Sequence, residues 1–66
     1  MNATQQVNTR IRAVKALRAA VQDGLDLEAF AAKIEKPAEN IGRWLAGQNL
    51  PHLSVAERIL AILSKP

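Results

Sequence analysis

Few side chains in this 66-residue sequence could take part in catalysis or bind a metal ion. His52 is the one histidine and there is no cysteine, so neither a zinc site nor a histidine–carboxylate–nucleophile set can be assembled with confidence from the residue types present. The chain has no glycine-rich phosphate loop, and Ser54 is better explained as a helix cap. We therefore expect a protein that is not an enzyme and that needs no metal, cofactor or small-molecule substrate.

The polar side chains that could make specific contacts lie between residues 39 and 43, and their types match the edges of DNA bases. Arg43 could make a bidentate contact to guanine or bind a phosphate in the groove wall. Glu39 could accept a hydrogen bond from the amino group of cytosine, or could only favour the positive end of a helix dipole. Asn40 could pair with adenine, although its position between two helix faces favours a solvated or backbone-bonded side chain.

A second polar set flanks this segment and suits contacts to the phosphate backbone. Lys33 and Lys36 are cations that can reach phosphates, whereas Gln48 and Asn49 offer amide side chains and main-chain N–H groups. Each of the four is also compatible with an ordinary exposed surface or loop position.

Two short helices must position these side chains, and their apolar spacing predicts them. Apolar residues recur at helical intervals in two sets, which are Leu27, Phe30, Ala31 and Ile34, and then Ile41, Trp44 and Leu45. The spacing predicts helices over about 27–35 and 38–46, separated by a break at Pro37, which should open the second helix. Helices this short and this tightly joined must cross, so residues 27–47 are predicted to form a helix-turn-helix.

Burial of the apolar set leaves an outward face on the second helix, composed of Glu39, Gly42, Arg43 and Ala46. A glycine inside a helix costs about 1 kcal/mol relative to alanine, and close approach to a surface is one reason for it. The major groove of B-DNA admits a single α-helix, and Ala38 and Ala46 could touch thymine methyl groups there. Trp44 shares the buried face and is expected in the core rather than as a stacking platform for bases.

Two further helices complete an all-α fold, predicted as a compact single domain, residues 1–66, of four or five short helices. The first spans about Thr4 to Asp23 and carries an apolar stripe made of Val7, Ile11, Val14, Leu17 and Val21. The last should start at Val55 and run to about Ser64, because Ser54 and Glu57 form a capping box. Gly24 and Gly47 should end helices, and Asp26 should cap the helix at 27–35.

The last helix is apolar over an arc wider than one core contact requires. The excess favours a homodimer, with Leu60 and Leu63 at its interface, over a bundle that wraps this helix fully.

The formal net charge is +3, and the cations gather near the N-terminus. Residues 1–22 contain four basic side chains and no acidic one, namely Arg10, Arg12, Lys15 and Arg18. This end is equally compatible with attraction to a polyanion and with a solvated helix face. The stems of Arg10 and Arg18 are expected along the core edge with their heads in water. With no bilayer-spanning apolar stretch and no signal-peptide pattern, we expect a cytoplasmic protein without a membrane partner.

The run GLDLEAFAAKIEKPAENIGRWLAG, followed by QNLPHL, resembles the DNA-binding domains of lambda-repressor-like proteins (the phage repressor, Cro and related bacterial regulators). The resemblance covers roughly residues 10–63 and is carried by Gly24, Leu25, Leu27, Phe30, Ala31, Ile34, Ile41, Arg43, Trp44, Gly47, Pro51 and Leu53. The family usually has glycine where Glu35 stands and an apolar residue where Lys36 stands. It often has an acidic residue, paired with an arginine of the first helix, where Leu45 stands.

The resemblance implies that base contacts concentrate on Ala38, Glu39, Asn40 and Arg43, and that the loop with Gln48 and Asn49 grips the DNA backbone. It implies a sequence-specific regulator of transcription that binds double-stranded DNA as a homodimer, most simply a repressor. The alternative is a helical protein-interaction module that uses the same fold without binding DNA. The modest net charge, the acidic Glu39 and the apolar excess of the last helix motivate this alternative.

Overall fold

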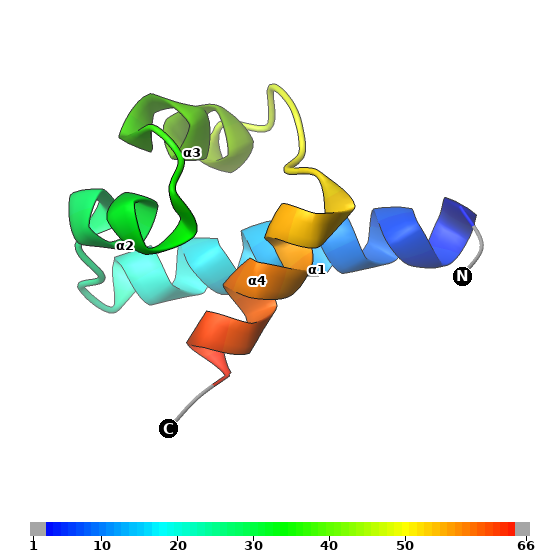
Figure 1. Ribbon diagram of the computed structural model, residues 1–66, viewed down its shortest axis with the longest axis horizontal. Helices are drawn as coiled ribbons and strands as arrows, with labels where there is room; N and C mark the ends of the chain where they lie inside the picture. Colours follow the sequence, from blue (N-terminus) through cyan, green and yellow to red (C-terminus); the bar gives the residue numbers. More distant parts are fainter. Residues whose placement is uncertain (1–2, 65–66) are drawn as a thin grey trace.

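The computed structural model describes residues 3–64 of the chain, which form four helices (Figure 1). These are α1 (Ala3–Gln22), α2 (Leu27–Ile34), α3 (Ala38–Leu45) and α4 (Leu53–Leu63). No β-strand occurs in this part of the chain, so the all-α prediction is confirmed. The predicted ends of α1, α2 and α3 agree with the observed ends to within one residue.

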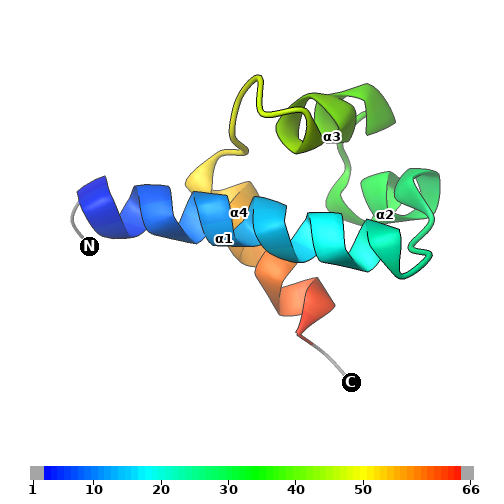
Figure 2. The same ribbon diagram turned by 180° about the vertical axis from the view of Figure 1, so that it is seen from behind.

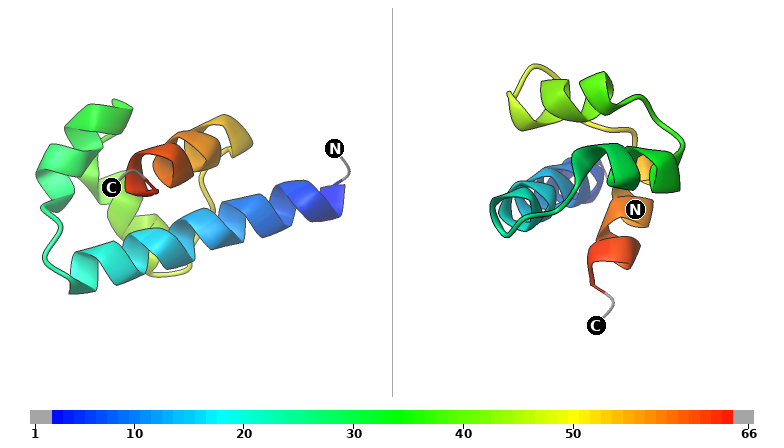
Figure 3. Two further views of the ribbon diagram at one scale, coloured as in Figure 1. Left: turned by 90° about the horizontal axis from the view of Figure 1, so that it is seen from below. Right: turned by 90° about the vertical axis from the view of Figure 1, so that its left-hand side faces the viewer.

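The other three helices are arranged along the long helix α1. Seen from either side, α4 crosses the middle of α1, while α2 and α3 lie over its C-terminal end (Figures 1 and 2). Two further views show the same arrangement, with the N-terminal part of α1 extending beyond the other helices (Figure 3). The molecule measures 33 × 28 × 20 Å along its principal axes.

One small core holds all four helices together. It is almost entirely aliphatic, with one phenylalanine and one tryptophan, and consists of Ala13, Val14, Leu17, Phe30, Ala31, Ile34, Ile41, Trp44, Ala56 and Ile59. The predicted stripe on α1 enters this core only in part. Val14 and Leu17 are buried in it, whereas Val7 and Ile11, nearer the N-terminus of α1, are 41% and 38% exposed.

The first three helices end in the same way, in a Schellman motif with one left-handed residue. After α1, Gly24 has φ +104 and Leu25 donates its N–H to the carbonyl of Ala20 (3.0 Å). After α3, Gly47 has φ +81 and Gln48 N–H bonds to Arg43 O (3.0 Å). Both glycines were predicted as helix ends, and left-handed backbone is the reason they suit these positions.

After α2 the left-handed residue is Glu35, with φ 58 and ψ 42. Its N–H bonds to Ala32 O (3.3 Å), and Lys36 N–H bonds to Ala31 O (3.1 Å). Glu35 therefore carries a side chain in a left-handed backbone conformation, which costs free energy relative to glycine.

The N-terminal ends of the helices were predicted correctly to within one residue except for that of α4. Asp26 caps α2 as expected, accepting hydrogen bonds from the N–H groups of Glu28 and Ala29 (3.0 and 3.3 Å). Pro37 lies just before α3 rather than inside its first turn. The capping box predicted at Ser54 is wrong, because α4 begins at Leu53 and His52 precedes it without a side-chain cap bond.

The apolar surface of α4 is only partly covered within the molecule. Ala56 and Ile59 are buried, whereas Leu60, Ile62 and Leu63 are half-buried against the core. Within residues 3–64, no helix has both the length and the apolar character needed to cross a bilayer.

Replacing Glu35 with glycine should stabilise the fold, since a left-handed side-chain-bearing residue costs roughly 1–2 kcal/mol and glycine recovers most of it. We expect the free energy of unfolding of Glu35→Gly to rise by about 1 kcal/mol, measured by chemical denaturation. Glu35→Gln is the matched control, because it removes the charge and leaves the backbone unchanged. An equal gain in both variants would attribute the effect to charge and refute the backbone explanation.

Candidate nucleic-acid interface

The helix α3 has two sharply different faces. Ile41 is fully buried and Trp44 is 6% exposed, so both enter the core, and Leu45 is half-buried beside them. The opposite side carries the exposed residues that the spacing predicted, namely Glu39, Gly42, Arg43 and Ala46. The burial of Trp44 confirms its expected place in the core. The predicted orientation of α3 is therefore confirmed, and its outward face is free of contacts with the core.

Gly42 lies in the interior of α3, at the centre of this outward face. A Cβ atom built at Gly42 would meet no heavy atom within 4 Å. The backbone is ordinary helix there, since the positive-φ glycines of the described chain are Gly24 and Gly47. Neither packing nor backbone conformation within the protein therefore requires glycine at this position.

Arg43 is oriented by a neighbour one turn before it. Its Nη1 donates a hydrogen bond to Oδ1 of Asn40 (3.4 Å), and Asn40 is half-buried on the flank of α3. Asn40 was expected to contact solvent or the backbone, so its bond to Arg43 is an additional finding. The contact directs the guanidinium towards the loop that follows α3.

A surface groove of about 260 Å³ runs between α3 and that loop. Several of the predicted polar residues line it together, namely Lys36, Asn40, Arg43 and Asn49. The exposed His52, for which the sequence indicated no role, lines it as well. Trp44, Leu50, Pro51 and Val55 complete the lining. The groove thus brings donors from the turn before α3, from α3 itself and from the following loop to one place.

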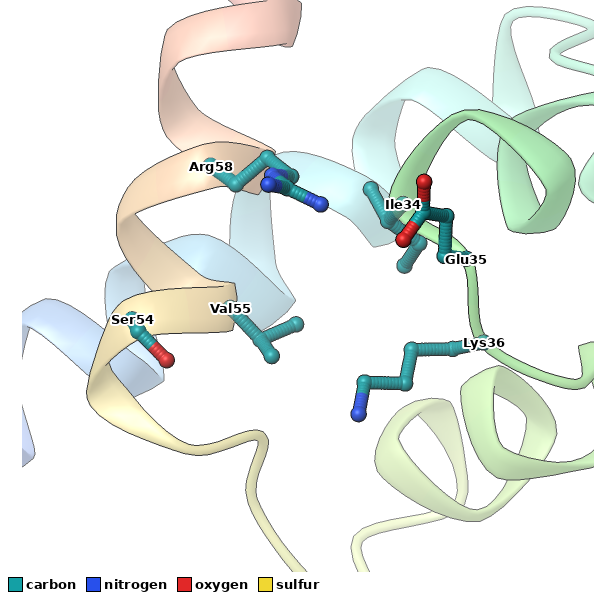
Figure 4. A pocket seen from close by; sticks show the side chains of 6 residues that line it. All are labelled: Ile34, Glu35, Lys36, Ser54, Val55 and Arg58. Atoms are coloured by element: carbon teal, nitrogen blue, oxygen red, sulfur yellow. The ribbon is translucent and has the colours of Figure 1, made fainter.

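A second hollow of about 220 Å³ lies between the turn after α2 and the start of α4 (Figure 4). Lys36 lines both hollows and lies between them. Arg58 of α4 and Glu35 lie on opposite sides of this second hollow, with Lys36 along its edge. Arg58 was not identified from the sequence, because only the fold brings α4 beside the turn. The charge of this second hollow is mixed.

The remaining predicted residues lie apart from the groove. Lys33 is exposed in the last turn of α2, Gln48 is exposed in the loop, and Glu39 is exposed on the outward face of α3. Ala38 is half-buried and packs against the core, so only part of it is available for an outside contact. Leu60 and Leu63 lie on α4 and do not line the groove.

Two arginine side chains of α1 form hydrogen bonds to the end of α3 and to the loop that follows it. Nη2 of Arg18 donates to the carbonyl of Leu45 (2.7 Å), the last residue of α3. Nε of Arg10 donates to the carbonyl of Pro51 (2.7 Å), and its Nη2 donates to that of Leu50 (3.4 Å). The sequence did not indicate that these heads bind backbone carbonyls. Arg18 is nevertheless exposed, as expected, whereas Arg10 is half-buried.

The Arg18 contact lies at Leu45, a position where this sequence departs from the pattern of the family it resembles. The resemblance implied an acidic partner at this position for an arginine of the first helix, and Arg18 instead binds the backbone carbonyl of Leu45. The eight-residue spacing of Arg10 and Arg18 along α1 was the available signal, since it places both near the apolar stripe. Arg12 and Lys15 are exposed.

Comparison with known proteins adds no identification, since no family model, no curated protein and no solved structure matches this chain. Within residues 3–64, no three histidine, cysteine or acidic side chains come together as a set that could hold a metal ion. Any proposed function therefore depends on the geometry of α3, the groove and the two arginines.

Removing the Arg10 contact should destabilise the fold, because the carbonyl of the buried Pro51 loses a charged donor. We expect Arg10→Met to lower the free energy of unfolding by about 1–2 kcal/mol in chemical denaturation. Arg12→Met removes the same charge and chain length from an exposed site on the same helix, and should change stability by less than about 0.5 kcal/mol. Equal losses in both would show that net charge, and not the carbonyl contact, is responsible.

Proposed function

We propose that this chain is a sequence-specific DNA-binding regulator of transcription that places α3 in the major groove. In this proposal α2, the turn at 35–37 and α3 act as a helix-turn-helix of the lambda-repressor-like kind. Base contacts come from the N-terminal part of α3, where Glu39, Asn40 and Arg43 lie. The chain is a cytoplasmic, non-enzymatic protein that represses by occupying a promoter.

Gly42 is the observation that carries the proposal. It weakens α3 by about 1 kcal/mol relative to alanine and has no packing neighbour within the protein that would explain it. An external surface that approaches the helix backbone supplies a reason, and the major groove is about the width of one helix. The exposed Glu39, Arg43 and Ala46 around Gly42 leave the outward face otherwise polar or small.

The surroundings of α3 support the same function. Lys33 and Lys36 precede α3, while Gln48 and Asn49 follow it, so phosphate contacts are available at both ends of the helix. The left-handed Glu35 stands where related domains usually have glycine, which favours the family's turn despite the different residue. These features are what a helix needs to be held in register along a duplex.

Two copies would place two recognition helices on one operator. A two-fold dimer reads half-sites about 34 Å apart, one turn of the DNA helix. The molecule is 33 Å long and 28 Å wide, so two adjacent copies have about this spacing. The half-covered Leu60 and Leu63 near the end of α4 supply an apolar surface for the contact.

The rival function is a helical module that binds another protein. The exposed Val7 and Ile11 favour it, because they form an apolar surface at the free end of α1. The absence of any shift of genomic fragments at low salt, together with a tight protein partner, would favour this rival over DNA binding.

Selection of bound duplexes from a random pool tests DNA binding, symmetry and spacing together. The proposal expects enrichment of inverted half-sites with centres about 10 base pairs apart. Recovery of unenriched sequence at every salt concentration would refute it.

The selected operator then allows the role of Arg43 to be measured. If its guanidinium reads a guanine, Arg43→Ala should lose about 1–3 kcal/mol of binding free energy on the operator and much less on random duplex. Fluorescence anisotropy at fixed salt provides both affinities. Equal weakening on the two duplexes would assign Arg43 to a phosphate and leave base reading to its neighbours.

Gly42→Ala should separate stability from binding. Because the site is open, alanine should raise the free energy of unfolding by about 0.5–1 kcal/mol through helix propensity. The added methyl group should also overpack the contact with DNA and weaken operator binding by about 1–3 kcal/mol. Ala46→Gly is the matched control, since it removes a methyl group from the same face. Stabilisation by Gly42→Ala without loss of affinity would contradict the close approach.

A further inference from the structure

The hollow between the end of α2 and the start of α4 contains charges of both signs that do not pair with each other. Glu35 and Arg58 lie on opposite sides of it, and Lys36 lies along its edge (Figure 4). Within residues 3–64, no ion pair joins Glu35 to either cation. Glu35 and Arg58 are exposed, whereas Lys36 is half-buried. The hollow therefore offers a carboxylate to a cationic group and two cations to an anionic group of one ligand.

Glu35 is the most unusual of these residues, because its backbone is left-handed, with φ 58 and ψ 42. In the described part of the chain it is the one residue other than glycine with positive φ. Glycine adopts this conformation at little cost, so the reversal after α2 does not explain why a side chain is present there. Residues held in such strained conformations cluster at ligand-binding sites. The carboxylate of Glu35 points towards Arg58 across the hollow, so contact with a ligand supplies a reason for the side chain (Figure 4).

The size and lining of the hollow restrict the ligand to a small molecule with a short apolar part. The volume of about 220 Å³ is below the roughly 300–1,000 Å³ of most small-molecule sites. Ile34, which is 2% exposed, and the half-buried Val55 form an apolar wall. Ser54 adds an exposed hydroxyl that makes no hydrogen bond within residues 3–64. A free α-amino acid has matching groups, namely a carboxylate, an ammonium group and a side chain.

We propose that this hollow binds a free α-amino acid with a short apolar side chain. Arg58 and Lys36 hold its carboxylate, Glu35 holds its ammonium group, and its side chain lies against Val55. The ligand thereby joins α4 to the turn that precedes α3. Because the hollow is small and open to solvent, we expect a dissociation constant of about 1 mM.

The bound amino acid also changes the surface that the proposed function uses. Lys36 lines both this hollow and the groove beside α3, where it is proposed to contact a DNA phosphate. A carboxylate bound to Lys36 neutralises that contact, so the amino acid and the operator oppose each other. This consequence rests on the proposed function, whereas the binding site does not. Coupling between two ligands is reciprocal, so each weakens the binding of the other by the same factor.

The binding site is tested by NMR of the full chain during titration with valine at neutral pH. Valine should cause saturable shifts of the backbone amides of Lys36, Ser54 and Val55. N-acetylvaline lacks the ammonium group and valinamide lacks the carboxylate, so each should bind at least about 5-fold more weakly than valine. Equal affinity for either compound, or no shift with valine up to about 50 mM, would overturn the inference.

Two variants and two matched controls assign the contacts. Glu35→Gln and Arg58→Gln each remove one charge from the hollow, and each should weaken valine binding by at least about 5-fold. Glu57→Gln and Arg12→Gln remove the same charges from exposed positions outside the hollow, and should retain wild-type affinity. An equal loss in the controls would show that net charge is responsible and refute the site.

The DNA arm measures operator affinity by fluorescence anisotropy with and without saturating valine. We expect valine to weaken operator binding by roughly 5-fold or more, and to lower the salt slope by about 0.9, the value for one phosphate contact. Glu35→Gln should bind the operator without this response to valine. Valine binding by a chain that binds no DNA would refute the proposed function and retain the site. Operator affinity that is unchanged by bound valine would overturn the coupling, and absence of valine binding would overturn the site whether or not DNA is bound.

Discussion

The insertion of Ile41 and Trp44 into the core is the constraint on which the rest of this structure depends. A helix of eight residues is not stable alone in water, so α3 exists because these side chains are buried by α1, α2 and α4. The same insertion fixes the rotation of α3 about its axis. Because side chains from two adjacent turns are buried, the side chains on the opposite face of α3 point away from the molecule. The orientation of Glu39, Gly42 and Arg43 is therefore a consequence of packing.

Apolar packing does not fix the position of α3 along its own axis or the path of the loop, and here α1 contributes directly. Arg18 binds the carbonyl at the last residue of α3, and Arg10 binds two carbonyls just before α4. The Leu45 carbonyl lies at a helix C-terminus, where carbonyls lack an intrahelical partner, and the Leu50 and Pro51 carbonyls lie in the loop before α4. The cationic face of α1 is thus only partly a solvent-facing surface, since two of its four cations hold the elements that frame the groove. The cations that remain available to attract a polyanion are Arg12, Lys15 and those near α3.

Features set by neighbours in the sequence were predictable, and features set by distant neighbours were not. Helix ends at Gly24 and Gly47, the cap at Asp26 and the buried face of α3 follow from local backbone and periodicity. The start of α4 was misplaced because Ser54 and Glu57 fit a local motif, whereas the observed helix begins two residues earlier, at Leu53. The groove and the arginine contacts join residues up to 41 positions apart. The spacing of Arg10 and Arg18 indicates which face of α1 they share, but not which carbonyls they bind.

Two residues near α3 lower the stability of the fold, and the difference between them is informative. The left-handed Glu35 costs free energy, but the reversal between α2 and α3 imposes that conformation on any residue placed there. Gly42 is under no such constraint, because alanine would fit the same helical backbone in open space. A domain of this size has only a few kcal/mol of stability in total, so a cost of about 1 kcal/mol is a sizeable fraction of it. Within residues 3–64, nothing explains the cost of Gly42 at the centre of the outward face of α3, and the proposed approach of a DNA groove to that face would account for it.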